Sequence, residues 1–334
     1  MAILQVDSLA VEYQTSQGRV RAVEGASFDV PEGSVLGLVG ESGCGKTTVA
    51  RAITGVMPSN ARLAAGRLVF KGKDLVAAAE AERNRVRWRE ISFVPQSAMN
   101  SLDPVYTVGS QLREVLARRG GYARMAAKER AAELFRLVGL SPGRLAEYPH
   151  QFSGGMRQRV AIALALALDP SLVIADEPVT ALDVIVQRQV LDVIRELQAR
   201  LQLSMMLVTH DISVVAYVCD RVVVMYAGKV VEDGSTAEVL ERAMHPYTMG
   251  LTNAFPDLER AGTVLVPIEG SPPDLIDPPE GCRFAPRCPF ALAVCKEVEP
   301  VLAGEGDHRA ACHRRGEAAI LRERAKETTT WLRS

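Results

Sequence analysis

The segment that most restricts how this chain can fold is glycine-rich and spans residues 40–47, with the sequence Gly-Glu-Ser-Gly-Cys-Gly-Lys-Thr. It matches the pattern G-x-x-x-x-G-K-[ST], in which glycines let the backbone curl so that amide N–H groups point at phosphate oxygens. An apolar run at 33–40 is typical of a buried parallel strand, and residues 47–54 have a helical pattern. A strand, a glycine-rich loop and a helix in this order predict a phosphate-binding site.

The loop and the threonine after it supply the candidate contacts to nucleotide: Gly40, Glu41, Ser42, Gly43, Cys44, Gly45, Lys46, Thr47 and Thr48. Lys46 is expected to reach the β- and γ-phosphates and Thr47 to bind Mg2+, while the helix offers its positive N-terminal end. We therefore expect ATP and Mg2+ as cofactors. Cys44 occupies a variable position of the pattern. Because helix N-termini lower thiol pKa values, we expect it to be modifiable by thiol reagents.

A carboxylate for magnesium follows a second apolar run, at residues 172–175. Asp176 would hold the metal, usually through water, and Glu177 would polarise the water that attacks the γ-phosphate. Taken alone, Asp-Glu-Pro after a strand is an ordinary turn. Its pairing with the phosphate loop favours a catalytic interpretation, with Glu177 as the base.

Alternating apolar runs and helical patterns predict an α/β fold with a mostly parallel sheet. Besides 33–40, buried strands are expected at 91–94, 172–175 and 205–208, and helices at 126–138 and 184–201. Patterns typical of antiparallel strands, expected to form a flanking β layer, occur at 4–11, 20–30, 221–226 and 229–232. Residues 75–89 are rich in Ala, Arg and Glu, which predicts a solvated helix.

Composition and charge limit the kinds of partner that this chain is expected to bind. The formal net charge of −1 gives no general footprint for nucleic acid. The N-terminal residues lack a charged leader followed by an apolar stretch, so we expect a cytoplasmic protein. No apolar run approaches the roughly 18–20 residues that span a bilayer, so any membrane contact is expected through a partner.

The C-terminal part has a different composition. Prolines are dense from residue 256 to 289, which disfavours continuous helices and central strands, so we place a domain boundary near residue 250 and expect domains at 1–250 and 251–334. This part of the chain also contains four of the six cysteines, namely Cys282, Cys288, Cys295 and Cys312. In a reducing compartment they indicate a metal site before disulfides. Their spacing differs from the C-x2-C pairs of common zinc modules, and four thiolates suit a [4Fe–4S] cluster. Zn2+ is the alternative, with His308 and His313 nearby in the sequence.

A segment upstream of Asp176 adds a family resemblance. Phe152-Ser153-Gly154-Gly155-Met156-Arg157-Gln158-Arg159 resembles the signature motif of ABC-transporter ATPases. In that family, the signature of one subunit closes over the ATP held by the phosphate loop of another. Ser153, Gly154 and Gly155, the phosphate-facing residues, match the motif, whereas Phe152 and Met156 depart from its commonest form.

Other family motifs follow in the expected order. Tyr13 resembles the residue that stacks on adenine, Gln96 the glutamine that senses the γ-phosphate and binds Mg2+, and His210 the switch histidine. Ala181-Leu182-Asp183 resembles the loop that meets the opposite subunit. Each taken singly has an ordinary structural explanation, but their joint order favours the resemblance. It implies a P-loop NTPase (RecA-like) core, an antiparallel β subdomain and a helical signature subdomain at about 98–165.

Segments outside these motifs are similar to the ATPase subunits of bacterial oligopeptide and dipeptide permeases. These segments are Asn100-Ser101-Leu102-Asp103-Pro104, Thr107-Val108-Gly109, His245-Pro246-Tyr247-Thr248 and Gly270-Ser271-Pro272-Pro273. The resemblance implies ATP-driven import of peptides at the cytoplasmic face of the membrane, with residues 98–106 docking a membrane subunit. Implied partners are a second ATPase subunit, expected to be non-identical, two transmembrane permease subunits and indirectly an extracytoplasmic solute-binding protein. Some members hold a [4Fe–4S] cluster in a similar cysteine extension.

Two other functions compete with peptide import. ABC-type ATPases of DNA repair or translation work without membrane partners, but they typically contain a long coiled coil or tandem ATPase domains, and this sequence shows neither. A non-catalytic ATP-binding subunit is the second alternative, and Glu177 and His210 argue against it. Nickel chelates, sugars and opine-like compounds remain alternatives to peptides as cargo.

Overall fold

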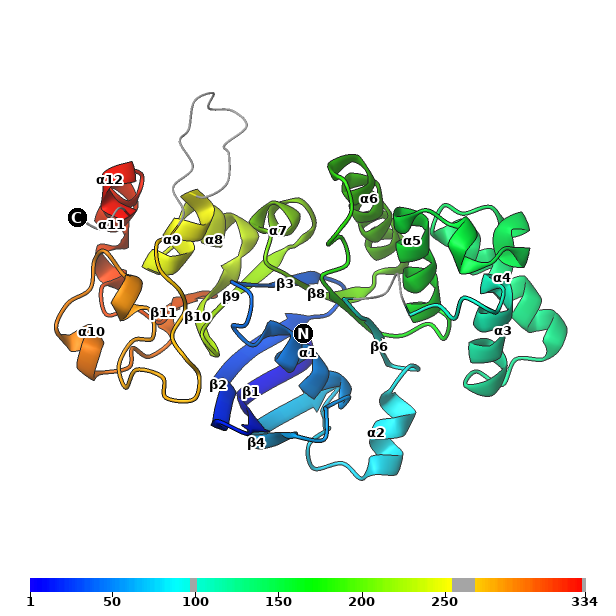
Figure 1. Cartoon of the computed structure of the whole chain (residues 1–334), viewed down its shortest axis with the longest axis horizontal. Coiled ribbons are helices and arrows are strands. Elements are labelled where there is room, and N and C mark those ends of the chain that lie inside the picture. The colour runs from blue at the N-terminus through cyan, green and yellow to red at the C-terminus, as the bar shows by residue number, and fades with distance from the viewer. Residues whose placement is uncertain (97–100, 254–267, 332–334) are drawn as a thin grey trace. The chain divides into compact units, whose positions relative to one another are not determined.

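The computed structural model describes residues 1–96, 101–253 and 268–331 (Figure 1). The chain forms two compact units, each built from several stretches of sequence. We call the unit formed by Met1–Ile3, Val30–Val35 and Lys73–Val208 the carboxylate unit. The loop unit comprises Leu4–Asp29, Leu36–Gly72 and Thr209–Ser334.

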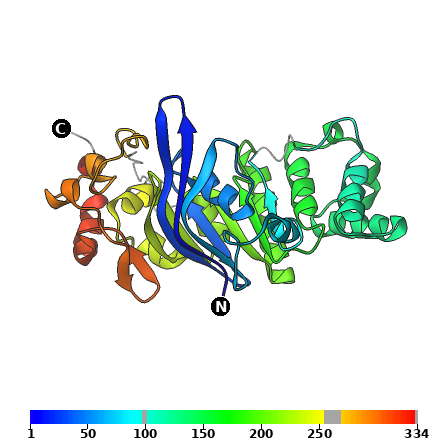
Figure 2. The ribbon, with the colours of Figure 1, turned by 90° about the horizontal axis from the view of Figure 1, so that it is seen from below.

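An antiparallel sheet forms the first layer of the loop unit. Within this unit its strands are β1 (Ala2–Thr15), β2 (Gly18–Pro31) and β4 (Ala61–Phe70), in the order β2-β1-β4. Figure 2 shows β1 and β2 as a long hairpin. Strands expected at 4–11 and 20–30 are confirmed. β4 was not expected, because Ala, Arg and Gly dominate it and few of its side chains are buried.

A second sheet contains the strand before the phosphate loop. β3 (Val35–Val39) pairs in parallel with β9 (Arg221–Tyr226), which pairs antiparallel with β10 (Lys229–Ser235). The strands expected at 221–226 and 229–232 therefore form, but their placement in a flanking layer was wrong, because they hydrogen-bond into the sheet of β3. Ala227 and Gly228 join β9 to β10 with φ values of 47° and 84°, as a tight hairpin of two left-handed residues requires. The sheet continues through β12 (His308–Ala310) and β11 (Ala303–Glu305), both from the C-terminal segment.

The remaining regular elements of the loop unit are helices. They are α1 (Lys46–Thr54), α7 (Ile212–Val218), α8 (Thr236–Glu241), α9 (Pro246–Asn253), α10 (Val294–Glu297), α11 (Ala318–Ala325) and α12 (Thr328–Trp331). Short 3-10 turns lie at Ala285–Arg287 and Arg315–Glu317. Short helices and turns suit the proline-rich C-terminal segment, because proline cannot continue a helix or a central strand.

The carboxylate unit contains three parallel strands, in the order β8-β7-β6, and the two-residue strand β5 (Lys73–Asp74). β6 (Ile91–Val94) has the expected bounds, while β7 (Leu172–Asp176) and β8 (Ser204–Thr209) are slightly longer than expected. Its helices are α2 (Glu80–Val86), α3 (Val108–Arg118), α4 (Arg124–Leu137), α5 (Gly154–Ala165) and α6 (Val184–Leu201), with 3-10 turns at Pro142–Ala146 and Pro149–Gln151. Figure 1 shows α3, α4 and α5 grouped together.

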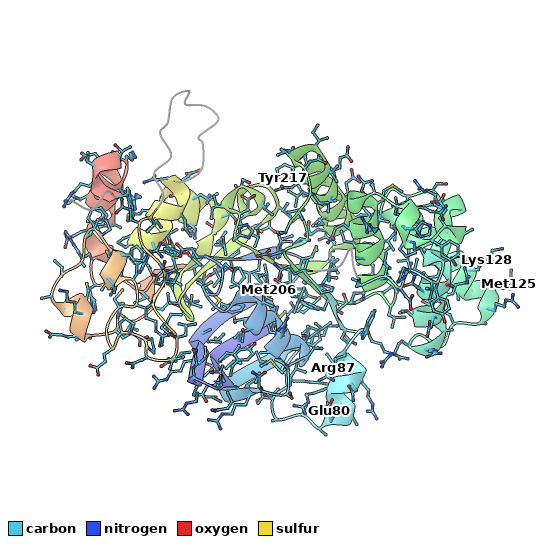
Figure 3. The ribbon with its side chains drawn as sticks, viewed as in Figure 1. Glu80, Arg87, Met125, Lys128, Met206 and Tyr217 are labelled. Carbon is cyan, nitrogen blue, oxygen red and sulfur yellow. The ribbon has the colours of Figure 1, made fainter. Side chains whose placement is uncertain are left out.

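The solvated helix expected at 75–89 forms only in part. Asp74 accepts hydrogen bonds from the amides of Val76 and Ala77, which makes a turn there, and α2 begins only at Glu80. None of the residues of α2 is buried, as expected. Glu80 pairs with Arg87 at 3.0 Å, and both are labelled in Figure 3.

The parallel strands, the antiparallel sheet and the helical group confirm the predicted α/β fold. Within the ranges that the structure describes, we find no helix with the length and apolar character needed to span a bilayer.

Candidate functional site

The phosphate loop begins directly after β3, whose five residues are all buried. Lys46, the first residue of α1, is only 5% exposed. Its Nζ donates hydrogen bonds to the carbonyl oxygens of Gly40 at 2.7 Å and Glu41 at 2.9 Å. The loop therefore curls around the ammonium group, and contact of Lys46 with the phosphates of ATP stays a prediction.

Two glycines of the loop are required by the surrounding backbone. A Cβ atom at Gly40 would lie 2.1 Å from the carbonyl oxygen of Met225 in β9. At Gly45, where φ is 105°, it would lie 2.4 Å from the carbonyl oxygen of Ala22 in β2. Gly43 has a φ of 80° but open space around it. The loop thus owes its shape to close contacts with neighbouring strands.

Cys44 does not have the environment expected of a reactive thiol. Its side chain is 2% exposed, and burial raises its pKa above the usual value although Lys46 Nζ lies 3.7 Å from Sγ. The expectation that the helix N-terminus lowers this pKa is therefore wrong, because desolvation of the thiolate outweighs the nearby positive charge.

Tyr13 lies close to the helix that follows the loop. Its hydroxyl oxygen is 3.1 Å from Thr48 Oγ1, so the tyrosine of β1 is tied to α1. The ring is half-buried. Stacking of Tyr13 on adenine and binding of Mg2+ by Thr47 stay predictions.

In the carboxylate unit, the chain turns sharply at the end of β7. Asp176, the last residue of this strand, is 1% exposed. Glu177 has a left-handed φ of 48°, and its N–H donates to the carbonyl oxygen of Val208 in β8 at 2.8 Å. Such a conformation is uncommon for a residue with a side chain and is found preferentially at functional sites.

Glu177 is held by two side chains. Its Oε2 accepts hydrogen bonds from Gln96 Nε2 and Thr180 Oγ1, both at 2.9 Å. Because β6 and β7 are parallel and Val94 pairs with Ala175, Gln96 and Glu177 follow the same edge of the sheet. The structure therefore brings these two predicted residues together.

Thr180 is a functional candidate that sequence reasoning missed. Its hydroxyl donates to Oε2 of Glu177, the proposed catalytic base, yet none of the family motifs includes it. The available signal was its position three residues after Glu177, where a turn places its hydroxyl beside the carboxylate.

The signature motif starts α5. The exposed Ser153 is the N-cap residue, and its Oγ accepts a hydrogen bond from the amide of Met156 at 3.3 Å. A Cβ atom at Gly155 would lie 2.2 Å from Val186 Cγ1 of α6, so this glycine is also required for helix packing. Gly154 is the first residue of the helix.

The two departures from the common signature share a partner. Phe152 is buried, with the guanidinium carbon of Arg144 4.9 Å from its ring centroid. Arg144 Nη1 also lies 3.4 Å from Met156 Sδ. Phe152 and Met156 therefore both contact Arg144. The departures do not affect the identity of Ser153, Gly154 and Gly155, which match the motif.

The last two motifs are the loop at 181–183 and His210, and both contain exposed residues. Ala181 has a φ of 65°, and Asp183 caps α6 by accepting the amide of Val186 at 2.9 Å. The next two side chains, Val184 and Ile185, are 81% and 73% exposed. His210 directly follows β8 and is exposed.

The segment expected to dock a membrane subunit is described only from Ser101 onward, since residues 97–100, including Asn100, lie outside the described residues. Val105 and Tyr106 are 69% and 58% exposed. Gln111 of α3 holds the turn before them, because its Oε1 accepts the Asp103 amide at 3.0 Å and its Nε2 donates to the Tyr106 carbonyl at 3.1 Å.

All four C-terminal cysteines line one cavity of about 20 Å³. The Leu292 amide donates to Cys295 Sγ at 3.5 Å, and the Arg314 amide to Cys312 Sγ at 3.4 Å. Burial raises the pKa of Cys288 to about 12 and that of Cys312 to about 11, so both are protonated without a metal. Sulfur atoms that accept backbone hydrogen bonds are typical of metal-bound thiolates.

The cysteines are not arranged as a finished metal site. Among the described residues, which include all four, no three Cys, His, Asp or Glu side chains are placed together as metal ligands. The two histidines considered for zinc are otherwise engaged. His308 Nε2 lies 2.8 Å from Glu232 Oε1, and His313 Nε2 lies 2.8 Å from the carbonyl oxygen of Val298.

Comparisons with known proteins place these features in a family. A model described as ABC transporter matches residues 23–180, and one described as Oligopeptide/dipeptide transporter, C-terminal region, matches residues 231–295. The Dipeptide transport ATP-binding protein DppD of Bacillus subtilis is 45% identical over 332 residues, covering 97% of this chain and 99% of the relative. The Oligopeptide transport ATP-binding protein OppD of Escherichia coli is 42% identical over 302 residues, covering 90% and 89%.

Solved structures agree on the fold. The dimeric post-hydrolysis state of the ATP-binding cassette MJ0796, bound to ADP and Pi, has a TM-score of 0.62 and 25% identity, covering 70% of this chain and 98% of that one. Also similar is cbiO1 of Clostridium perfringens, part of the ABC transporter complex cbiONQ, with a TM-score of 0.62 and 26% identity, covering 72% and 91%. The chain belongs to the ATP-binding subunits of ABC transporters, in the family of the oligopeptide and dipeptide permeases.

Proposed function

We propose that this chain hydrolyses ATP to power the import of peptides across the cytoplasmic membrane. The observation that supports catalysis most directly is the position of Glu177, at the end of a buried strand and held by Gln96 and Thr180 at 2.9 Å each. Peptides are the proposed cargo because relatives named for dipeptide and oligopeptide transport match almost the whole chain.

Each motif residue has a proposed role. Lys46 and the loop amides bind the phosphates, and Thr47 and Asp176 hold Mg2+ with Gln96. Glu177 polarises the attacking water, and His210 contacts the γ-phosphate. Tyr13 contacts adenine, and Ser153, Gly154 and Gly155 contact the nucleotide held by the opposing subunit.

Transport would follow from a two-state cycle of the ATPase pair. ATP favours the closed dimer only to the extent that it binds that state better than the open one, and hydrolysis lets the subunits part. We propose that the exposed Val184 and Ile185 lie at this dimer surface. The exposed Val105 and Tyr106 would contact one of two membrane permease subunits, to which an extracytoplasmic binding protein delivers cargo. The second ATPase subunit is proposed to be a different chain, and this one to lie at the cytoplasmic face of the membrane.

We also propose a nucleotide-binding domain at 1–250, with a helical subdomain at about 98–165, and an extension at 251–334 that binds a [4Fe–4S] cluster. The four thiols around one cavity and the backbone N–H groups at two sulfurs support this donor set. Held by four cysteine sulfurs, the cluster would cross-link the parts of the extension that contain these cysteines. Iron and sulfide analysis of anaerobically purified protein tests this, and stoichiometric zinc without iron would contradict it.

ATP turnover by a Glu177→Gln variant tests the main proposal. We expect turnover to fall by at least about 100-fold, because the amide cannot act as a base, with ATP binding retained. Glu196→Gln, an exposed carboxylate of α6, is the matched control and should hydrolyse ATP normally. Near-normal turnover by Glu177→Gln would refute its assignment as the base.

A further inference from the structure

The phosphate loop contains a carboxylate, Glu41, next to the amides that are proposed to face ATP. A negative charge there opposes the binding of an anionic ligand. Arg287, from the C-terminal segment, meets this carboxylate: its Nη1 donates to Glu41 Oε2 at 2.8 Å. The Arg287 side chain is 5% exposed and that of Glu41 26%, so the pair is largely shielded from solvent.

Arg287 is fixed in place by further acceptors. Its Nε donates to the carbonyl oxygen of Glu269 at 3.0 Å and its Nη2 to that of Ile268 at 3.1 Å. Nη1 also lies 3.2 Å from the Tyr226 hydroxyl. A guanidinium held at each of its nitrogen atoms is pre-organised, so little side-chain entropy is lost when it meets Glu41.

The backbone of Glu41 is held by a second residue from outside the loop. Its N–H donates to the Tyr247 hydroxyl oxygen at 2.8 Å. Tyr247 is fully buried, and its ring centroid lies 4.6 Å from that of Tyr226 and 5.4 Å from that of Phe284. One residue of the phosphate loop is therefore fixed at both its side chain and its amide.

These contacts connect the loop to the segment that contains the cysteines. Arg287 directly precedes Cys288, and Phe284 lies two residues after Cys282. Phe284, Cys282 and Cys288 all line the cysteine cavity. The position of the Arg287 guanidinium thus depends on how this segment folds.

We infer that Arg287 and Tyr247 are positioning residues for ATP binding. Arg287 neutralises Glu41 and Tyr247 fixes its amide, so the C-terminal segment sets the affinity of the phosphate loop for nucleotide. The inference rests on the proposed role of that loop in binding ATP.

The test measures the Kd for Mg-ATP, by equilibrium dialysis, in the full-length chain and in Arg287→Met, Glu41→Gln and the double variant. Arg287→Met should raise Kd by about tenfold, the scale of a lost charge-assisted hydrogen bond, and more at low than at high salt. Glu41→Gln alone should weaken binding less than Arg287→Met does, because it removes the charge that Arg287 neutralises and leaves an amide oxygen that can accept from Nη1. The double variant should match Glu41→Gln.

Rescue by Glu41→Gln separates charge neutralisation from a merely structural role. If the double variant binds as weakly as Arg287→Met, or if Arg287→Met binds normally, the inference is wrong. Arg287→Lys keeps the charge but not the fork of donors, and should weaken binding less than Arg287→Met. If Arg287→Met does not fold, Arg287→Lys with and without Glu41→Gln gives the same comparison.

Two more variants complete the experiment. Tyr247→Phe removes only the acceptor of the Glu41 amide and should speed hydrogen exchange of that amide. Unchanged exchange would exclude Tyr247 from the inference. Lys46→Ala tests separately whether the phosphate loop binds ATP at all. Normal ATP binding by Lys46→Ala would refute that proposed role of the loop. Loss of binding by Lys46→Ala with normal binding by Arg287→Met would refute the present inference alone.

Discussion

In the phosphate loop close contacts of the backbone set the shape, whereas at the end of β7 a single side chain is oriented by its neighbours. Gly40 and Gly45 leave no room for a Cβ atom, because carbonyl oxygens would lie 2.1 and 2.4 Å from it. Glu177, by contrast, depends on hydrogen bonds from Gln96 and Thr180. A backbone site is therefore sensitive to added atoms, and a side-chain site to removed ones.

The largest effect that this comparison predicts is that of Gly45→Ala. The added Cβ atom must displace the backbone of β2, which we expect to cost about 3 kcal/mol and to weaken ATP binding by roughly 100-fold. Equilibrium dialysis with Mg-ATP measures this. Gly43→Ala is the control, since its φ of 80° causes strain but nothing lies within 4 Å of the added atom. Equal effects of the two substitutions would show that strain, and not close packing, shapes the loop.

A second prediction concerns the buried support of the loop. His245 Nδ1 accepts the Tyr247 amide at 3.0 Å, and burial lowers the pKa of His245 from 6.5 to about 3. Between these values the unfolded chain binds a proton that the folded chain does not. The free energy of unfolding should therefore fall as pH decreases from 6.5 towards 3, by up to about 1.4 kcal/mol per pH unit, and His245 should contribute no pH dependence above 6.5.

Urea unfolding of His245→Asn at several pH values isolates this contribution, because asparagine retains an acceptor but does not titrate. The slope of unfolding free energy against pH should become shallower below pH 6.5. His150→Asn, at an exposed position, should keep the slope of the unsubstituted chain. Identical slopes in all three proteins would mean that the buried histidine does not titrate as described.

At the end of β7 we expect Thr180→Val to have a smaller effect, on kcat and not on the affinity for ATP. Loss of one hydrogen bond to Glu177 should lower kcat by roughly tenfold at most, because Gln96 still holds the same oxygen. The affinity for ATP should stay unchanged. Thr180→Ser keeps the hydroxyl and should retain most activity. A rise in KM without a fall in kcat would assign Thr180 to nucleotide binding and not to orientation of the base.

The smallest expected effect is at Cys44. Because burial raises its pKa and leaves it 2% exposed, N-ethylmaleimide should label it far more slowly than a free thiol near pH 7. Mass spectrometry of the peptide containing Cys44 measures this, with chain unfolded in guanidinium as the control. Rapid labelling of the folded protein would show that the loop opens readily, in contrast to its packed glycines.

Strong local patterns predicted much of the fold. β6 and α6 have the expected bounds, because a short apolar run and a sustained helical period leave little choice. β4 could not be predicted in the same way, since its pairing with β1 and not its own composition makes it a strand. The partial helix at α2 shows the opposite case, in which the Asp74 side chain accepts a hydrogen bond from the Val76 amide and overrides a helical composition.

The loop pattern, the order of the motifs and the residues at the ends of the buried strands can be read from the sequence alone. This is possible because phosphate binding and parallel strands need particular residues at fixed spacings. Three features appear only in the folded chain: Thr180 donates to Glu177, burial raises the pKa of Cys44, and Arg287 meets Glu41 across 246 positions of sequence. Solvent exclusion and contacts between distant segments arise only when the chain has folded, so no local pattern records them.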